Sequence, residues 1–267
     1  MHSRIERLVS TTKPKLKTLA TIAAAGTVSL LLAGSSSTKT STPWNLKGAT
    51  VIDLSHVSEH DMPVADPALA TPTYKWFSEV GSKEFSPLHN LEDVHYCPHT
   101  GTHMDSPFHV NSSWGAVETV DPTILIGPAS VVSLSVPAGA YAITSAEIKG
   151  WEAKNGPIRA GDGVLIHTGH DANWPDKKKF IADGYPYLAA EAAQYLADKK
   201  IRYVGMESIS PDADSTDSHK ILLGNKIAII ENVTNLGLIK QPRCNTIGTF
   251  ANEKGASGVH IRLLAVK

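Results

Sequence analysis

The chain has 267 residues, of which 42% are hydrophobic and 19% charged. These proportions belong to a globular protein with a sizeable core and exclude a disordered, collagen-like or coiled-coil chain. The net charge of −1 gives no indication of a surface for nucleic acid. Two cysteines are too few for a disulfide scaffold or a thiolate zinc site. Twelve histidines are the unusual feature of the composition.

Residues 1–42 have the pattern of a secretory signal peptide followed by a Ser/Thr-rich linker. Six basic residues against one acidic residue give this segment a net charge of +5, which leaves −6 for the rest. An apolar run at 19–33 is shorter than the ~20 residues of a spanning helix, so we expect no stable membrane span. The pattern predicts a secreted or periplasmic protein; an organellar protein, or one attached to a membrane through an uncleaved leader, is the alternative. In an exported chain Cys97 and Cys244 either form a disulfide or are two free thiols.

Residues 43–267 contain no repeat, low-complexity tract or convincing linker, and we expect one α/β domain. Runs rich in Val and Ile predict strands over residues 49–54, 129–134, 163–167, 203–206, 226–231 and 259–266. Helices are predicted over residues 144–153, with Thr144 as N-cap, and over residues 188–199. The second helix leads into the strand at 203–206, a step typical of α/β folds. Residues 55–96 contain four prolines and little periodicity, which predicts a long functional loop.

Three histidines and one aspartate lie close together in the sequence: His99, His103, Asp105 and His109. Imidazole and carboxylate are a ligand set for zinc, manganese or ferrous iron. Because Gly101 interrupts a helix, we expect an extended or turning chain, in which His103 and Asp105 point to the same side. Gly101 also lets the backbone fold His99 back beside them. Any one of these histidines fits a hydrogen-bonded loop, but the four residues together indicate a metal site.

His219 and Glu231 are the candidates for the rest of the ligand set. Glu231 ends the predicted strand at 226–231, where a buried strand delivers a carboxylate to the edge of a site. His219 precedes a short apolar stretch, which we interpret as a turn that leads into that strand. Taken alone, Glu231 fits a solvated strand end better than a metal ligand.

These motifs resemble the cyclase family of metal-dependent hydrolases, which includes bacterial kynurenine formamidase and isatin hydrolase. The resemblance runs from about residue 51 to residue 266. It is carried by the segment from His99 to His109, by GDGVLIHTG at 161–169, and by His219 with Glu231 and Asn232. It implies a single α/β domain with the family's swivelling β/β/α fold, and a homo-oligomer that is a dimer or tetramer.

The resemblance also implies a role for each candidate residue. The first divalent metal is held by His99, His103 and Asp105. Asp105 bridges to a second ion held by His219, and Glu231 contacts both ions. His109 occupies the position of the family's proton donor and acceptor. Two ions, zinc or manganese, would activate water and polarise the carbonyl that it attacks, and a histidine is suited to bring a proton to the leaving nitrogen.

The sequence departs from the formamidases on the substrate side. Ala65 stands where their tryptophan contacts the aromatic substrate, and its loss removes a stacking contact. Trp76 or Phe77, on the same predicted loop, are candidates to replace it. Glu207 stands where the family usually has an aspartate, a change of one methylene.

The sequence therefore predicts a metal-dependent amidohydrolase that acts on a small cyclic or aryl amide, with a small-molecule substrate and no nucleic-acid partner. Two other functions would use the same residues. One is a metal-assisted lactone-forming cyclase or dehydratase, and the other is a non-catalytic metal or small-molecule binding protein on the same fold. A proton-transferring His109 argues against the binding protein, since binding alone needs no such group.

Overall fold

The computed structural model describes residues 46–83 and 88–267, and these residues belong to one compact unit. The strands are β1 (Val51–Asp53), β2 (Thr73–Ser78), β3 (Leu91–His95), β4 (His103–Asp105), β5 (Gly127–Ser133), β6 (Tyr141–Ile143), β7 (Gly163–His167), β8 (Pro186–Leu188), β9 (Tyr203–Met206), β10 (Ala228–Glu231), β11 (Arg243–Phe250) and β12 (Gly258–Val266). The helices are α1 (Ser145–Asn155), α2 (Ala190–Asp198) and α3 (Asp217–Gly224). Shorter helical turns lie at Pro107–His109, Val117–Thr119, His170–Asn173, Lys178–Ala182 and Leu236–Leu238.

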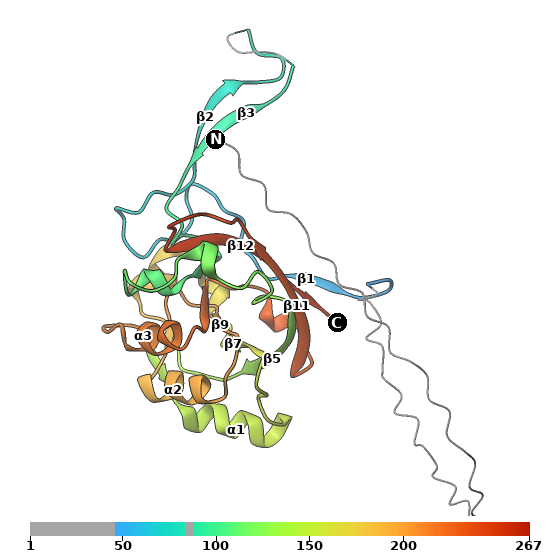
Figure 1. Ribbon diagram of the computed structural model, residues 1–267, viewed down its shortest axis with the longest axis vertical. Helices are drawn as coiled ribbons and strands as arrows, with labels where there is room; N and C mark the ends of the chain where they lie inside the picture. Colours follow the sequence, from blue (N-terminus) through green and yellow to red (C-terminus); the bar gives the residue numbers. More distant parts are fainter. Residues whose placement is uncertain (1–45, 84–87) are drawn as a thin grey trace, which may run out of the picture. The chain divides into compact units, whose positions relative to one another are not determined.

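Within the described residues, seven strands close into a barrel in the order β12-β11-β5-β7-β9-β10-β4, because β4 pairs with both β10 and β12. Strand β1 extends the sheet from β12. Strands β5, β7, β9 and β10 are parallel, whereas β4, β11 and β12 pair antiparallel with their neighbours. Helices α1, α2 and α3 lie along one side of the barrel (Figure 1). The fold is therefore the α/β arrangement that the sequence predicts.

Alternate residues of the barrel strands fill two separate cores, as the two-residue period of a strand requires. The inner core contains Met104, Leu165, Tyr203, Ile230 and Leu263. The outer core lies against the helices and contains Val164, Val204, Ile229, Ile148, Leu196 and Leu222. Since Met104 faces inward, the flanking side chains of β4 face outward, toward the helix side.

Most of the predicted elements are confirmed. The strands predicted at 163–167 and 203–206 coincide with β7 and β9, and those predicted at 129–134, 226–231 and 259–266 match β5, β10 and β12 within two residues. Helix α1 begins after Thr144, whose hydroxyl accepts a hydrogen bond from the Glu147 N–H. The Glu147 carboxylate accepts one from the Thr144 N–H in return, and this capping box explains why the helix begins there.

Three expectations are corrected by the structure. Residues 55–96 are not one long loop, because β2 and β3 pair as a hairpin within them. His219 does not precede a turn but lies in the first part of α3, whose eight residues are too short to show a clear helical period in the sequence. Leu188 belongs to β8 and α2 begins two residues later, at Ala190. Strand β11 was not predicted, because polar residues interrupt its apolar pattern.

The expected leader and linker, residues 1–42, lie outside the described residues. Among the residues described, no helix is both long and apolar enough to cross a membrane. Cys97 and Cys244 are free thiols, the first partly exposed before β4 and the second buried in β11. Of the two alternatives that the sequence leaves open, a disulfide or two free thiols, the structure has the free thiols.

The capping box predicts the effect of one substitution. Thr144→Ala removes the hydroxyl that accepts from Glu147, and we expect it to lower the free energy of unfolding by about 1 kcal/mol. Urea denaturation of the two proteins measures this difference. Ser145→Ala is the matched control, because the Ser145 side chain takes no part in the capping box and its loss should cost less than about 0.5 kcal/mol. Equal losses in the two variants would contradict the assignment of Thr144 as N-cap.

Candidate metal centre

Strand β4 places His103 and Asp105 on the outer face of the barrel, and both side chains are buried. On one side, β10 pairs Glu231 with His103 and Ile229 with Asp105. Residues paired across an antiparallel ladder share a face, so the Glu231 carboxylate joins the two β4 side chains. The His103 Nε2 atom lies 3.4 Å from Glu231 Oε2 and 3.5 Å from Asp105 Oδ1.

His99 turns back toward β4 as the sequence predicts, because Gly101 adopts a positive φ of 59°. Its Nδ1 atom lies 2.8 Å from Asp105 Oδ1, and its Nε2 atom hydrogen-bonds the Ser257 hydroxyl at 2.8 Å. The ring lies over Gly258 of β12, where an added Cβ would come within 2.6 Å of the imidazole. A glycine at 258 is therefore what allows the ring to lie this close to the sheet.

His219 reaches the same place from the first turn of α3. Its Nε2 atom lies 3.4 Å from Glu231 Oε1 and 3.7 Å from Asp105 Oδ2. Five predicted ligands thus converge, although they come from a loop, two strands and a helix: His99, His103, Asp105, His219 and Glu231.

Hydrogen bonds on the far sides of the rings fix which nitrogen faces the cluster. His103 Nδ1 donates to the Gly101 carbonyl at 2.9 Å, which leaves Nε2 without a proton to face Asp105 and Glu231 when the ring is neutral. His219 Nδ1 donates to Asp212 Oδ2 at 2.7 Å, with the same consequence. Such outer partners hold the orientation of metal-binding histidines.

Charge in the cluster is strongly coupled. Burial opposes a charged imidazole, but the neighbouring carboxylates outweigh it and raise the pKa of His103 to about 9 and that of His219 to about 12. Burial and the charge of Asp105 raise the pKa of Glu231. The three neighbouring histidines overcome the effect of burial and hold the pKa of Asp105 well below its usual range. The two carboxylates therefore need positive charge beside them, which protons on the rings or a bound cation can supply.

The donors fit a divalent cation. His103 Nε2 and both carboxylate oxygens of Asp105 are buried and form no hydrogen bond of good geometry among the described residues. Ligand atoms of His103, Asp105 and Glu231 lie within 4.8 Å of one another. Buried polar atoms without partners are costly, and coordination to a metal satisfies them. Imidazole nitrogen and carboxylate oxygen are ligands of zinc and manganese.

His109 lies beside the cluster rather than inside it. Its ring stacks on His99, with centroids 4.0 Å apart, and lies 5.5 Å from the His219 ring. It is exposed, in contrast to the buried His103 and Asp105. A ligand atom of His109 also lies within 4.8 Å of ligand atoms of His99 and Asp105, so its position suits either a proton-transfer group or an additional ligand.

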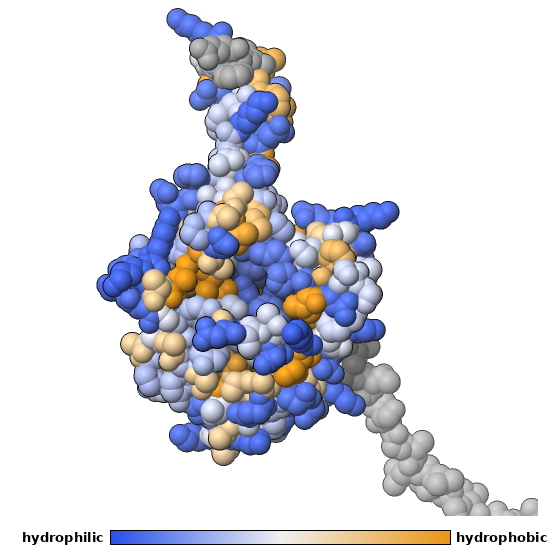
Figure 2. Space-filling model, turned by 90° about the vertical axis from the view of Figure 1, so that its left-hand side faces the viewer, coloured by the Kyte–Doolittle hydropathy of each residue, from blue (hydrophilic) through white to orange (hydrophobic). Residues whose placement is uncertain are grey.

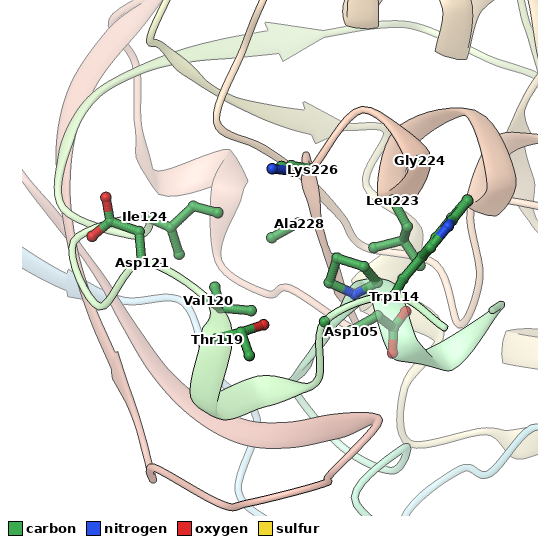
Figure 3. A pocket seen from close by; sticks show the side chains of 12 residues that line it. Asp105, Trp114, Thr119, Val120, Asp121, Ile124, Leu223, Gly224, Lys226 and Ala228 are labelled. Carbon is green, nitrogen blue, oxygen red and sulfur yellow. The ribbon is translucent and has the colours of Figure 1, made fainter. Parts of the chain in front are cut away.

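A cavity of about 510 Å³ lies next to the Asp105 side of the cluster. Figure 3 shows Trp114 and Leu223 beside Asp105, and Val120 and Ile124 across the cavity from them. Its walls are mainly apolar, and Lys226 adds a positive charge. This is space for a small molecule with an aromatic or aliphatic body.

The expected replacement for the formamidase tryptophan is not found at this cavity. Trp76 and Phe77 lie on β2, and their exposed fractions are 39% and 48%. Neither residue lines the cavity beside Asp105. The prediction placed them on a loop with the substrate contacts, whereas the hairpin carries them on a separate two-stranded sheet.

Glu207 binds the backbone and a side chain of the segment that follows β7, a role that the sequence does not indicate. One carboxylate oxygen accepts hydrogen bonds from the backbone N–H groups of Thr168, Gly169 and His170, and the other contacts His167 Nδ1 at 2.6 Å. The carboxylate therefore closes the turn that follows β7. The extra methylene relative to aspartate does not prevent these contacts.

Three residues that support the ligands were missed at the sequence level: Asp212, Ser257 and Gly258. Asp212 lies seven residues before His219, a spacing that matches neither a helix nor a strand period. The two side chains meet only because α3 begins between them. Ser257 and Gly258 lie in the last quarter of the chain and reach His99 only through the β4–β12 pairing. The acidic residues that precede His219 in the sequence indicate Asp212 only weakly, because Asp214 and Asp217 lie nearer to it.

Residues 52–213 match the family model described as "Putative cyclase". The chain is 29% identical to the isatin hydrolase of Roseibium aggregatum, over 63% of this chain and 71% of that protein. It is 31% identical to the kynurenine formamidase of Bacillus cytotoxicus, over 57% of this chain and 68% of that protein.

Solved structures of isatin hydrolases share the fold. One, bound to the product analogue thioisatinate, superposes with a TM-score of 0.77 at 24% identity and covers 83% of this chain and 94% of that one. Isatin hydrolase A from Ralstonia solanacearum superposes with a TM-score of 0.73 at 22% identity, over 82% and 92% of the two chains. The family match includes the residues from His99 to His109 but ends before His219 and Glu231, which therefore enter the site through the geometry above.

The contact between Asp212 and His219 predicts that Asp212 controls metal affinity. Asp212→Asn retains one acceptor oxygen but loses the charge and the second oxygen, so His219 Nδ1 and two backbone N–H groups compete for it. We expect the dissociation constant for Zn²⁺ to rise by about 10–100-fold, as measured by competition with a chelating dye. Asp214→Asn, at an exposed neighbour, is the control and should leave the affinity unchanged. Unchanged affinity in Asp212→Asn would show that His219 needs no such support.

Proposed function

Because the chain belongs to the cyclase family of metal-dependent hydrolases, we propose that it hydrolyses the C–N bond of a small cyclic or aryl amide. The observation that carries this proposal is the buried convergence of Asp105 and Glu231 on the Nε2 atoms of His103 and His219. The names of the relatives, isatin hydrolase and kynurenine formamidase, supply the substrate class.

Two divalent ions, zinc or manganese, are the cofactor in this proposal. His99, His103 and Asp105 would hold the first, Asp105 and His219 the second, and Glu231 would contact both. Asp105 suits a shared role because one of its oxygens faces His99 and His103 and the other faces His219. When bound, such ions would lower the pKa of water to about 7 and polarise the carbonyl under attack.

The protein's own residues supply orientation and proton transfer. His103 and His219 keep Nε2 directed at the cluster through their bonds to Gly101 and Asp212. Burial and the charges of the neighbouring histidines lower the pKa of His109 to about 4, so this imidazole is neutral at pH 7. One edge of His109 reaches solvent, and the ring therefore suits transfer of a proton between water and the leaving nitrogen.

The cavity beside Asp105 is the place that we propose for the body of the substrate. Trp114 offers a flat aromatic wall, and Leu223 and Val120 add apolar contacts. An aryl ring bound there would contact Trp114 by stacking, a contact worth about 0.5–1.5 kcal/mol beyond burial. This arrangement would take over the role of the tryptophan that Ala65 replaces.

A comparison of two histidine variants tests the proposed division between ligand and proton carrier. His109→Ala should keep the metal content of the wild type while turnover falls by about 10²–10⁴. His103→Ala should lose metal, since it removes a buried ligand. Metal analysis and a hydrolysis screen over formanilides, isatin-like lactams and lactones measure both effects. If only lactones were turned over, the result would contradict the amidohydrolase and favour the lactone-forming cyclase. If both variants lost metal equally, His109 would be a metal ligand and not the proton carrier.

We also propose that the protein is exported. The basic residues, the apolar run and the small residues at the start of the chain support this, because they follow the order of a signal peptide. Mass spectrometry of the protein isolated from its native cells should find a mature chain that begins between about residues 34 and 42. Retention of Met1 would contradict export.

A further inference from the structure

Lys226 is the only basic residue among the described residues that line the cavity beside Asp105. The other walls are mainly apolar, and Trp114 provides their aromatic surface. Figure 2, which shows the side of the molecule that carries α3, has hydrophobic residues gathered beside a hollow. A single ammonium group in such surroundings favours a ligand with an apolar body and one negatively charged group.

The end of α3 does not need the charge of this lysine. A basic side chain after a helix commonly serves the last carbonyl groups of that helix. Here the carbonyls of Ile221, Leu222 and Leu223 accept hydrogen bonds from the backbone N–H groups of residues 225–227. Within the part of the chain that the structure describes, the Lys226 ammonium forms no ion pair or hydrogen bond. It is therefore available to a ligand.

The carboxylates that line the cavity do not neutralise Lys226. Asp121 Oδ1 accepts hydrogen bonds from the Thr123 N–H at 2.8 Å and from the Thr123 hydroxyl at 2.7 Å. In Figure 3 the Asp121 carboxylate points away from Lys226. Asp105 belongs to the metal cluster, and the positive groups there balance its charge. An anionic ligand would therefore meet Lys226 without a competing carboxylate.

Lys226 has a matched counterpart elsewhere in the chain. Its φ is 59°, in the left-handed region where glycine or asparagine commonly follows a helix. Lys200 follows α2 with a φ of 58°, but it does not line the cavity. The backbone conformation therefore does not distinguish the two lysines, whereas their surroundings do. Lys200 is a control for the loss of a lysine charge at such a position.

We propose that Lys226 binds an acidic group of the substrate, and that the substrate is an aryl amide with a carboxylate on its ring and no ammonium group. This inference rests on the proposed function, which places the body of the substrate in the cavity. Trp114 lies against the end of α3, where a Cβ added to Gly224 would come within 3.0 Å of its ring. Lys226 follows Gly224 by two residues, so one end of α3 would hold both the ring and the acid.

The spacing along β10 suits one aryl ring between two polar ends. Ile229 is the cross-strand partner of Asp105 and follows Lys226 by three residues. Three residues of extended chain span at most about 10 Å. A ring with an amide at one end and an acid at the other fits such a span. The amide would lie toward the metal cluster, and the carboxylate would lie toward Lys226.

Calorimetric binding of two ligands of equal shape tests the inference without turnover. Para-aminobenzoate carries the acid, and para-aminoacetophenone carries a neutral group in its place. The metal-loaded wild type should bind the acid about 3–10-fold more tightly, because the ion pair forms in a partly exposed cavity. Lys226→Gln should abolish this preference, Lys226→Arg should retain it, and Lys200→Gln should leave it unchanged. The preference should weaken as salt is added.

Kinetics on the matching formamides separate this inference from the proposed function. The ratio of kcat/KM for para-formamidobenzoate to that for para-formamidoacetophenone should follow the same pattern across the variants. If neither formamide is hydrolysed but the binding preference depends on Lys226, the hydrolase is contradicted and the anion site is supported. Equal binding of the two ligands by the wild type would overturn the inference. A preference that survives Lys226→Gln would also overturn it, since the metal ions would then hold the acid.

Discussion

Asp105 and Glu231 are buried within reach of the same two imidazoles, and two carboxylates so placed repel each other unless positive charge lies beside them. In the protein alone, protonated His103 and His219 supply that charge, which is why the pKa of each ring is raised. A divalent cation supplies it without protons and also satisfies the unpaired oxygens of Asp105. The surrounding fold can be understood as the means of bringing these acidic and basic groups together out of water.

Three different structural devices accomplish this. The antiparallel register of β4 and β10 sets Glu231 opposite His103, so the spacing of these ligands follows from backbone hydrogen bonds. Helix α3 begins at Asp217, after the segment that follows β9, and its first turn brings His219 over the same face. The third device is the outer set of partners: Gly101 and Asp212 orient rings through hydrogen bonds, and Gly258 leaves room for His99. The inner core packs on the opposite face of the strands that carry His103, Asp105 and Glu231, and it therefore holds these strands in place.

The sequence predicts those parts of the site in which neighbouring residues decide the outcome. His103 and Asp105 share a side because they alternate along an extended chain, and a glycine two residues before His103 explains the return of His99. Glu231 and His219 were found by type and by resemblance, but their contact with β4 depends on strand pairing between distant segments. Asp212 and the β2–β3 hairpin could not be predicted from the sequence. Asp212 reaches His219 only because of where α3 begins. The hairpin strands mix charged and aromatic residues and are too short to show a clear two-residue period.

The central claim is that this cluster holds divalent metal, and anomalous diffraction from crystals grown with Zn²⁺ or Mn²⁺ tests it most directly. Data collected on both sides of the metal's absorption edge locate the ion without reference to activity. The account predicts an anomalous peak between Asp105 and Glu231, about 2.0–2.2 Å from carboxylate oxygens and from Nε2 of His103 or His219. No peak within coordinating distance of Asp105, or a peak held only by residues outside the cluster, would contradict it.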